Sequence, residues 1–417
     1  MTLNLTTMDN MIKVHYAPGP VVNMAFQQNK LVGLMTKRNR KLNGSVGGKY
    51  WFQPIRWGLP GQGSVDFATA MAATPNSSFA GFQVTRAHHY RRCLVDNETI
   101  EATATGDMDA FEPALDEFDR GLEAEANYLN FRAYRTKGGY IGRMTNSSFA
   151  TAVMTLDDAA GTWAVRQGDI LVLSVADGTS GAVRAGTLTV ASVQRRAGTI
   201  TFTGNISAGV AAAAQNDFVF LQKDYGFTDG FSISGLLDWL PDTDPTSTAF
   251  FGQDRSLEPE MLGGLRVDGT GGDPIHEVMI QMVVEADNLG AEPDVLFANP
   301  RALGSLSKQL EGKWVIMKAQ EYGGREAEIG YKGWQVNLEG HEVTIMSDRM
   351  CPTKRMFALD IDAWTMFSAG TAPMFLFKRF QTIMKPAESA DAYESRIGEY
   401  ANISCAAPGH NVNAQLQ

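Results

Sequence analysis

The chain has 417 residues, of which 44% are hydrophobic and 20% charged, so it can bury several cores and is not expected to be disordered. Its three cysteines (Cys93, Cys351 and Cys405) stand far apart without CxxC or Cys/His clustering, which argues against a disulfide framework or a zinc site. No apolar run approaches about 18 residues, and residues 1–16 lack a signal-peptide pattern. We therefore expect a soluble protein that is made in a cytoplasm and does not associate with a membrane.

The net charge of −10 is unevenly distributed. Residues 1–65 carry eight basic side chains and one acidic one, whereas residues 96–125 carry eleven acidic side chains and one basic one. The basic run at residues 37–41 could bind nucleic acid, could be a solvated face, or could pair with the acidic segment of another subunit. We favour the last reading, and its candidate contacts are Lys37, Arg38, Arg40 and Lys41 on one side and Asp116, Glu117, Asp119, Glu123 and Glu125 on the other.

The first 100 residues predict an extended region. Residues 1–48 mix single apolar positions with Gly, Pro and Asn, which is typical of an arm. Residues 49–57 are aromatic and partly alternating, which favours a strand with Pro54 at an edge or bulge. A Gly/Pro-rich tip follows at residues 58–63, and a second strand is expected over residues 79–95. Residues 49–100 thus predict a long hairpin-like loop.

The clearest helix of the sequence is expected to begin no later than Pro113 and to reach about Arg135. Apolar residues recur along it at steps of three and four, which predicts one apolar face that belongs to an internal core more often than to a partner surface. This stripe consists of Phe111, Leu115, Phe118, Leu122, Ala126 and Leu129. At ~1.5 Å per residue the helix would span roughly 35 Å.

Later segments predict two further units. Residues 163–223 contain short β-rich runs separated by turn residues and no histidine, which favours a small all-β insert without catalytic function. A mixed α/β pattern follows, with helices expected at residues 275–289 and 301–311 around a buried strand at residues 295–297. Strands then dominate, and the polar residues 411–417 are expected to be frayed.

The sequence carries no recognisable catalytic constellation. The glycine-rich runs at Gly61 and Gly269 lack the order of a phosphate loop, and no GxSxG motif is present. His88 and His89 would point to opposite faces of a strand and so could not easily hold one metal ion. The acids Asp238, Asp242 and Asp244 resemble the start of a calcium loop but lack its glycine and glutamate. We expect no catalytic, cofactor-binding or metal site and predict that the protein is not an enzyme.

Three segments resemble the coat proteins of tailed bacteriophages: KYWFQPIRWG from Lys49, PDVLFANPRALGSLSKQLEG from Pro293 and ESRIGEYANISCAAP from Glu394. Together with the element order, they make the chain similar to the α+β Hong Kong 97-like capsid fold over nearly its whole length. That resemblance implies an N-terminal arm (residues 1–48), an extended loop (49–100), a spine helix with the first part of the peripheral domain (101–162), an insertion domain (163–223), an axial domain (224–354) and a return to the peripheral domain (355–417).

The resemblance also implies a function and partners. The family builds icosahedral shells from hexamers and pentamers of one subunit around double-stranded DNA, which it does not bind sequence-specifically. It implies a portal protein and allows decoration proteins, and a separate scaffolding protein is expected because no Glu/Lys-rich helical leader is recognisable here. The virion would be assembled in the cytoplasm of a host bacterium. The alternatives are the shell of an encapsulin-like nanocompartment and, from another class, a soluble hydrolase or binding protein with a β insert.

Overall fold

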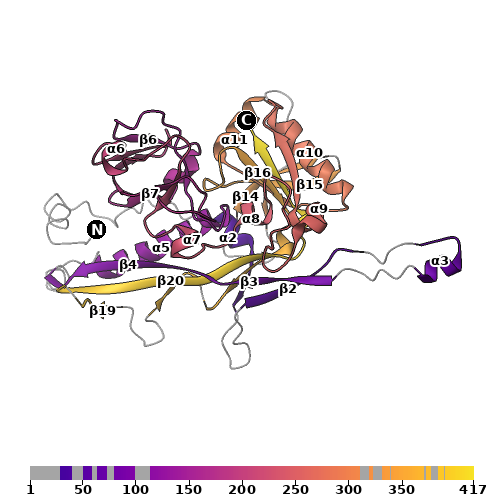
Figure 1. The fold of residues 1–417 in the computed structure, drawn as a ribbon, viewed down its shortest axis with the longest axis horizontal. Helices are drawn as coiled ribbons and strands as arrows, with labels where there is room; N and C mark the ends of the chain where they lie inside the picture. The colour runs from indigo at the N-terminus through magenta and orange to yellow at the C-terminus, as the bar shows by residue number, and fades with distance from the viewer. Residues whose placement is uncertain are drawn as a thin grey trace.

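The computed structural model describes residues 29–39, 50–58, 63–72, 79–98, 113–309, 319–322, 331–338, 340–370, 372–376, 384–388 and 390–417. Two compact bodies lie side by side on a base of long strands, and a hairpin projects from this base (Figure 1). None of the helices in these ranges is long and apolar enough to cross a membrane.

The base is a sheet of six described strands with β20 at its centre, and β4, β17, β18 and β19 all pair with β20. β20 pairs antiparallel with β4, from Ala392 opposite Asp96 to Ala401 opposite Ala87, and β17 continues along the far part of β20. β1 lies parallel to β17 at the edge. The strands are β1 (Thr36–Asn39), β4 (Ala87–Asp96), β17 (Trp364–Ser368), β18 (Met374–Phe375), β19 (Lys385–Pro386) and β20 (Ala392–Cys405).

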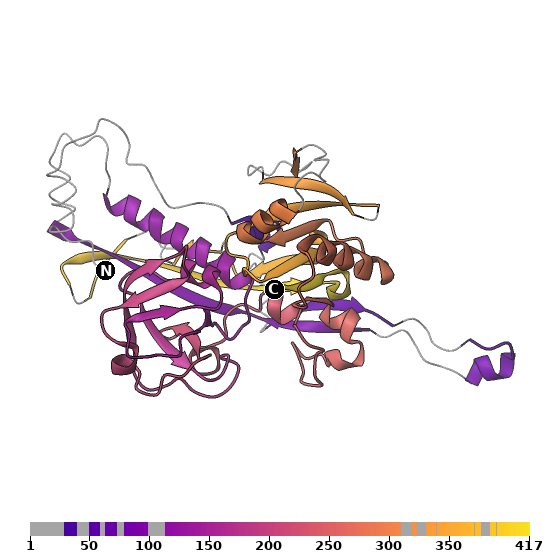
Figure 2. The same ribbon diagram turned by 90° about the horizontal axis from the view of Figure 1, so that it is seen from above.

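The projecting hairpin consists of β2 (Tyr50–Arg56) and β3 (Phe79–Thr85), which pair antiparallel, with the short helix α3 (Phe67–Ala72) farther out (Figure 2). The single strand expected over residues 79–95 is in fact two strands that separate at Arg86. β3 stays with the hairpin, whereas β4 leaves it to pair with β20. The chain thus changes partner where the hairpin joins the base.

The predicted long helix is α5 (Pro113–Ala133), which lies above β4. In its apolar stripe, Phe118 and Leu129 are 1% exposed, which confirms that these positions belong to an internal core. Phe111 and the side chain of Leu115 lie outside the described residues. Residues 128–133 at the end of the helix are all buried, including the polar side chains of Asn130 and Arg132. The short helix α2 (Lys30–Leu34) packs on this half of α5, and Asn130 accepts a hydrogen bond from the Val32 amide.

The β insert contains, among the described residues, six strands in the order β5-β10-β7-β8-β9-β6. Its sheet begins earlier than the expected boundary at residue 163, because β5 and β6 pair with β10 and β9. The elements are β5 (Gly142–Arg143), β6 (Val153–Thr155), η1 (Ala159–Trp163), β7 (Ile170–Ser174), β8 (Leu188–Gln194), β9 (Thr199–Phe202), α6 (Ile206–Gly209) and β10 (Phe218–Leu221), followed by α7 (Gly226–Asp229) and α8 (Leu236–Trp239).

The second body is built on a mixed sheet with the order β11-β21-β16-β12-β15-β14-β13 over the described strands. These are β11 (Leu265–Gly269), β12 (Val295–Ala298), β13 (Ala319–Tyr322), β14 (Tyr331–Leu338), β15 (His341–Ser347), β16 (Arg355–Leu359) and β21 (Val412–Leu416). The helical segments are η2 (Arg255–Leu257), α9 (Pro259–Gly263), α10 (Ile275–Asn288), α11 (Pro300–Gln309), η3 (Ile361–Ala363) and η5 (Pro408–His410).

The expectation of a frayed C-terminus was wrong. β21 lies between β11 and β16, with Val412, Ala414 and Leu416 in the core of this body. The polar residues alternate with these apolar ones, and the buried side-chain amide of Asn413 donates a hydrogen bond of 3.0 Å to the carbonyl of Leu240. Residues 355–417 therefore contribute to both parts of the molecule: they supply β17 and β20 to the base and β16 and β21 to this sheet.

Candidate assembly surfaces and a buried charge cluster

The projecting hairpin exposes large apolar side chains. Phe67 and Met71 of α3 are 78% and 65% exposed, and on the strands Phe52 and Phe79 are 57% and 71% exposed. The tip of the Phe52 ring lies over Gly81, where a Cβ atom would overlap it, so the glycine allows the aromatic ring to cover the opposite strand. Large apolar side chains exposed on a projecting element are typical of a region that binds a partner.

The part of the predicted basic cluster that the structure describes lies at the edge of the base. Lys37 and Arg38 belong to β1, opposite Met366 and Phe367 of β17, and their side chains are outside the described set. Arg40 and Lys41 lie outside the described residues.

The acidic residues of α5 do not form a uniform surface. Asp119 is exposed, Glu117 and Glu123 are half-buried, and the side chain of Asp116 is outside the described set. Glu125 is 0% exposed, which corrects the expectation of a surface contact for this residue. It faces the inside of the subunit because its carboxylate is bound there by cationic side chains.

Glu125 lies at the centre of a charge cluster that joins α5 to β4. The carboxylate is hydrogen-bonded to Nδ1 of His89, accepts a hydrogen bond of 3.0 Å from Nε of Arg91 and lies 3.6 Å from Arg132. Burial alone would raise the pKa of Glu125, but the hydrogen bond to His89 and the charges of His89, Arg132 and Arg91 outweigh it and lower the pKa to about 2.

The cluster continues toward the β insert and β20. Nε2 of His89 lies 3.7 Å from Asp224, which also accepts a hydrogen bond of 2.7 Å from the hydroxyl of Tyr128. Arg132 pairs with the buried Glu399 of β20. Desolvation and Arg132 lower the pKa of His89, but the two flanking carboxylates outweigh them and raise it. One buried network thus fastens helix, base and insert together.

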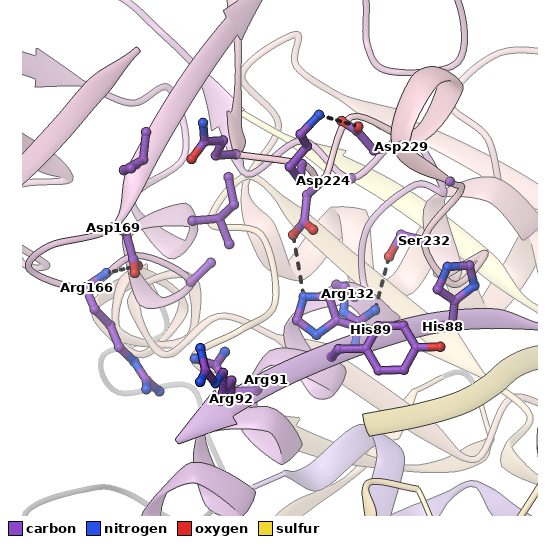
Figure 3. Close-up of a pocket in the computed structure, with 18 of the residues that line it drawn as sticks. His88, His89, Arg91, Arg92, Arg132, Arg166, Asp169, Asp224, Asp229 and Ser232 are labelled. Atoms are coloured by element: carbon purple, nitrogen blue, oxygen red, sulfur yellow. Dashed lines mark hydrogen bonds and ion pairs between the residues drawn. The ribbon is translucent and has the colours of Figure 1, made fainter. Parts of the chain in front are cut away.

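A cavity of about 600 Å³ opens beside this cluster, between β4 and the insert (Figure 3). Its charged lining residues are largely paired within the chain, for example Lys223 with Asp229 at 3.5 Å and Arg91 with Glu125. His88 is exposed, whereas His89 packs on the ring of Tyr128, as expected for neighbours on a strand. Within the described ranges, no group of three or more His, Cys, Asp or Glu side chains is arranged to hold a metal ion.

The three acids that resemble a calcium loop serve separate contacts. Asp238 accepts a hydrogen bond from the amide of Lys137, Asp242 pairs with Arg355, and Asp244 accepts one of 2.8 Å from Arg266. Three different elements hold them, so they do not converge on one point.

The comparisons with known proteins identify the fold. No protein-family model and no curated protein matches the sequence. Among solved structures, the chain is similar to the capsid asymmetric unit of cyanophage A-1(L), with a TM-score of 0.54, 12% identity and 96% of each chain covered. The chain therefore has the α+β fold of a phage capsid protein, which confirms the predicted Hong Kong 97-like architecture.

Two further solved structures are less similar to the chain, with TM-scores below 0.5. The capsid of a native GTA particle gives a TM-score of 0.49 at 9% identity, with 99% of this chain and 98% of that chain covered. The SrpI encapsulin of Synechococcus elongatus PCC 7942 gives 0.47 at 8% identity, with 99% and 96% covered.

Sequence reasoning missed the buried network and the apolar hairpin surface. Arg132 and Glu399 are far apart in the chain, and no local pattern links them. The sequence does contain a weak indication of the hairpin surface. Phe67 and Met71 follow a Gly/Pro-rich segment, where apolar side chains have no local core to pack on.

Proposed function

We propose that the protein is the major capsid protein of a tailed double-stranded DNA bacteriophage, a shell subunit and not an enzyme. The observation that carries the proposal is the projecting hairpin with its exposed aromatic and aliphatic side chains, on a chain that has a capsid-protein fold. An isolated soluble protein seldom exposes such a surface without a partner to cover it.

Assembly would follow from geometry. A hairpin that reaches beyond the subunit body can lie over a neighbour, so each copy buries more surface than two compact bodies in contact would bury. Contacts between different surfaces of identical subunits close into rings when the rotation allows it, which is how hexamers and pentamers arise. Many such rings form a closed shell.

Charge would contribute to the same contacts. Lys37, Arg38, Arg40 and Lys41 of one subunit would face Asp116, Glu117, Asp119 and Glu123 of the next. Glu125 is left out because its carboxylate is engaged inside its own subunit. Exposed pairs contribute about 0 to 1 kcal/mol each, so their effect depends on repetition over the shell.

The proposal includes partners and a location. The shell would enclose double-stranded DNA without binding it sequence-specifically, meet a portal protein, depend on a separate scaffolding protein and accept decoration proteins. Its location would be the virion, after assembly in the host cytoplasm. The net charge of −10 suits a wall from which packaged DNA is repelled.

The test replaces the apolar tip of the hairpin. Phe67→Asp with Met71→Asp should abolish or strongly reduce particles seen by light scattering and negative-stain microscopy, while the subunit keeps its unfolding midpoint. Leu257→Asp is the control, since Leu257 is 68% exposed and lies on η2 and not on α3. Particles at wild-type yield from the double variant would contradict the proposal, as would a wild-type protein that stays monomeric with a scaffold partner. Particles filled with a cargo enzyme instead of DNA would favour the nanocompartment alternative.

A further inference from the structure

A second cavity, of about 380 Å³, lies at the junction between the β insert and the body that carries the seven-stranded sheet. Arg195 and Arg196 reach it from the turn between β8 and β9, Arg301 from the first turn of α11, and Arg349 from the segment after β15. No carboxylate is among the described residues that line this cavity. We call these four arginines the arginine groove.

Three of the four guanidinium groups of the arginine groove, those of Arg195, Arg301 and Arg349, are held in position. Those of Arg195 and Arg349 lie 5.1 and 4.7 Å from the ring centroid of Trp163, so one indole positions two cations from different bodies. Arg301 donates hydrogen bonds to the backbone carbonyls of Arg195 and Arg196, which fixes the turn against α11. Pre-organised donors bind an anion with less loss of side-chain entropy.

The nearby acids balance only part of this charge. Asp158 lies behind the groove but pairs with Arg135. Asp348 and Glu123 attract Arg349, while Arg195 repels it. Among the residues that the structure describes, Arg195, Arg196 and Arg301 make no ion pair with a carboxylate, so the insert side of the groove remains electropositive in a chain of net charge −10.

We propose that the arginine groove binds phosphate groups. Several guanidinium forks that converge on one small cavity suit a tetrahedral anion with several acceptor oxygens, whereas a single carboxylate would leave most of the donors unused. The phosphate could belong to a nucleic-acid backbone or to a free nucleotide, and both share this chemistry. Acidic protein segments are the competing class of ligand.

The experiment measures binding to the full-length protein at two salt concentrations. A fluorescent single-stranded oligothymidylate is followed by anisotropy, and pyrophosphate, ATP, unlabelled oligothymidylate and poly-glutamate are titrated as competitors. Arg195→Ala with Arg196→Ala removes two cations from an exposed turn, and Arg143→Ala with Lys308→Ala is the control of equal charge change outside the groove. Trp163→Leu tests the positioning role.

We expect the groove variant to lose at least about tenfold in affinity and to show a weaker salt dependence, whereas the control changes less than about twofold. Displacement by ATP or pyrophosphate at equal phosphate concentration would identify free nucleotides as the source, and displacement only by oligonucleotide would identify the backbone. Equal losses in the groove and control variants, no binding by the wild-type protein, or poly-glutamate binding as tightly as oligonucleotide would overturn the proposal. None of these outcomes depends on shell formation.

Discussion

The imidazole of His89 on β4 is hydrogen-bonded to the buried carboxylate of Glu125 on α5. Because β4 also pairs along its whole length with β20, this contact fixes the long helix to the base of the molecule. Asp224 on the other side of the imidazole extends the link to the end of the β insert. The three parts of the chain therefore share one electrostatic junction.

Replacing Glu125 with alanine should destabilise the subunit by about 3 kcal/mol or more. The change leaves Arg91, Arg132 and His89 without their common counter-charge in a buried site, which costs more than the loss of an exposed pair. Urea denaturation followed by circular dichroism measures the change. Asp119→Ala, on the exposed part of the same helix, should shift the free energy of unfolding by less than about 0.5 kcal/mol. Similar values for the two variants would show that the junction does not stabilise the fold.

The stabilisation that this junction gives to the folded subunit should be lost at both low and high pH. The folded pKa of Glu125, about 2, is below its ordinary value of 4.5, so its stabilisation is present above pH 4.5 and is lost as the pH falls toward 2. The folded pKa of His89 is raised above 6.5, so its stabilisation is present below pH 6.5 and is lost as the pH rises through that raised value.

The unfolding temperature of the wild-type protein and of His89→Gln, measured from pH 3 to pH 9, checks this dependence. The two proteins should differ most near pH 5 to 6 and converge at alkaline pH, because His89 is then neutral in both states of the wild type. A difference that stays constant across the range would rule out a charged His89.

Local patterns predicted the elements but not their long-range partners. The spacing of Phe118 and Leu129 was enough to place α5 and its buried face, because helical periodicity is a local property. The strand exchange at Arg86 and the burial of β21 depend on pairing with β20 and β16, which lie far away in the sequence. Likewise, the acidic run correctly suggested an ionic role for Glu125 but not that its partners lie inside the subunit.

Replacing Asp238 with asparagine should stabilise the protein at alkaline pH. Burial raises the pKa of Asp238 to about 7, against the opposing effects of the Lys137 amide and of the charges of Lys137 and Arg255. The folded state therefore holds a proton that the unfolded state releases near pH 3.8, so this residue makes the protein less stable as the pH rises from about 4 to 7.

An asparagine oxygen can still accept the hydrogen bond from Lys137 and carries no charge. We expect a gain of about 1 kcal/mol or more at pH 8 and almost none at pH 4, measured by chemical denaturation at both values. Asp273→Asn, at an exposed position, is the control of equal charge change. A gain of equal size at pH 4 would mean that ionisation of Asp238 is not the cause.

Reversing the charge of the basic arm should impair assembly more than folding. Arg38→Glu, Arg40→Glu and Lys41→Glu together would repel the acidic residues proposed as their partners in the neighbouring subunit. Particle yield and unfolding midpoint are measured side by side. The control of equal charge change combines Arg143→Glu, Lys223→Glu and Lys308→Glu. If the particle yield of the arm variant is no lower than that of this control, the proposed pairing is refuted.

Two helical glycines should respond oppositely to alanine. A methyl group on Gly121 of α5 would overlap Sγ of Cys93 and lie 2.9 Å from Cδ1 of Ile397, whereas one on Gly304 of α11 meets nothing within 4 Å. Alanine gains up to about 1 kcal/mol of helix propensity at either site, but overpacking costs about 1 to 3 kcal/mol where neighbours must move. We therefore expect Gly304→Ala to stabilise the protein and Gly121→Ala to destabilise it in thermal unfolding. If Gly121→Ala is as stable as Gly304→Ala, then α5 does not pack as closely on β4 and β20 as the structure shows.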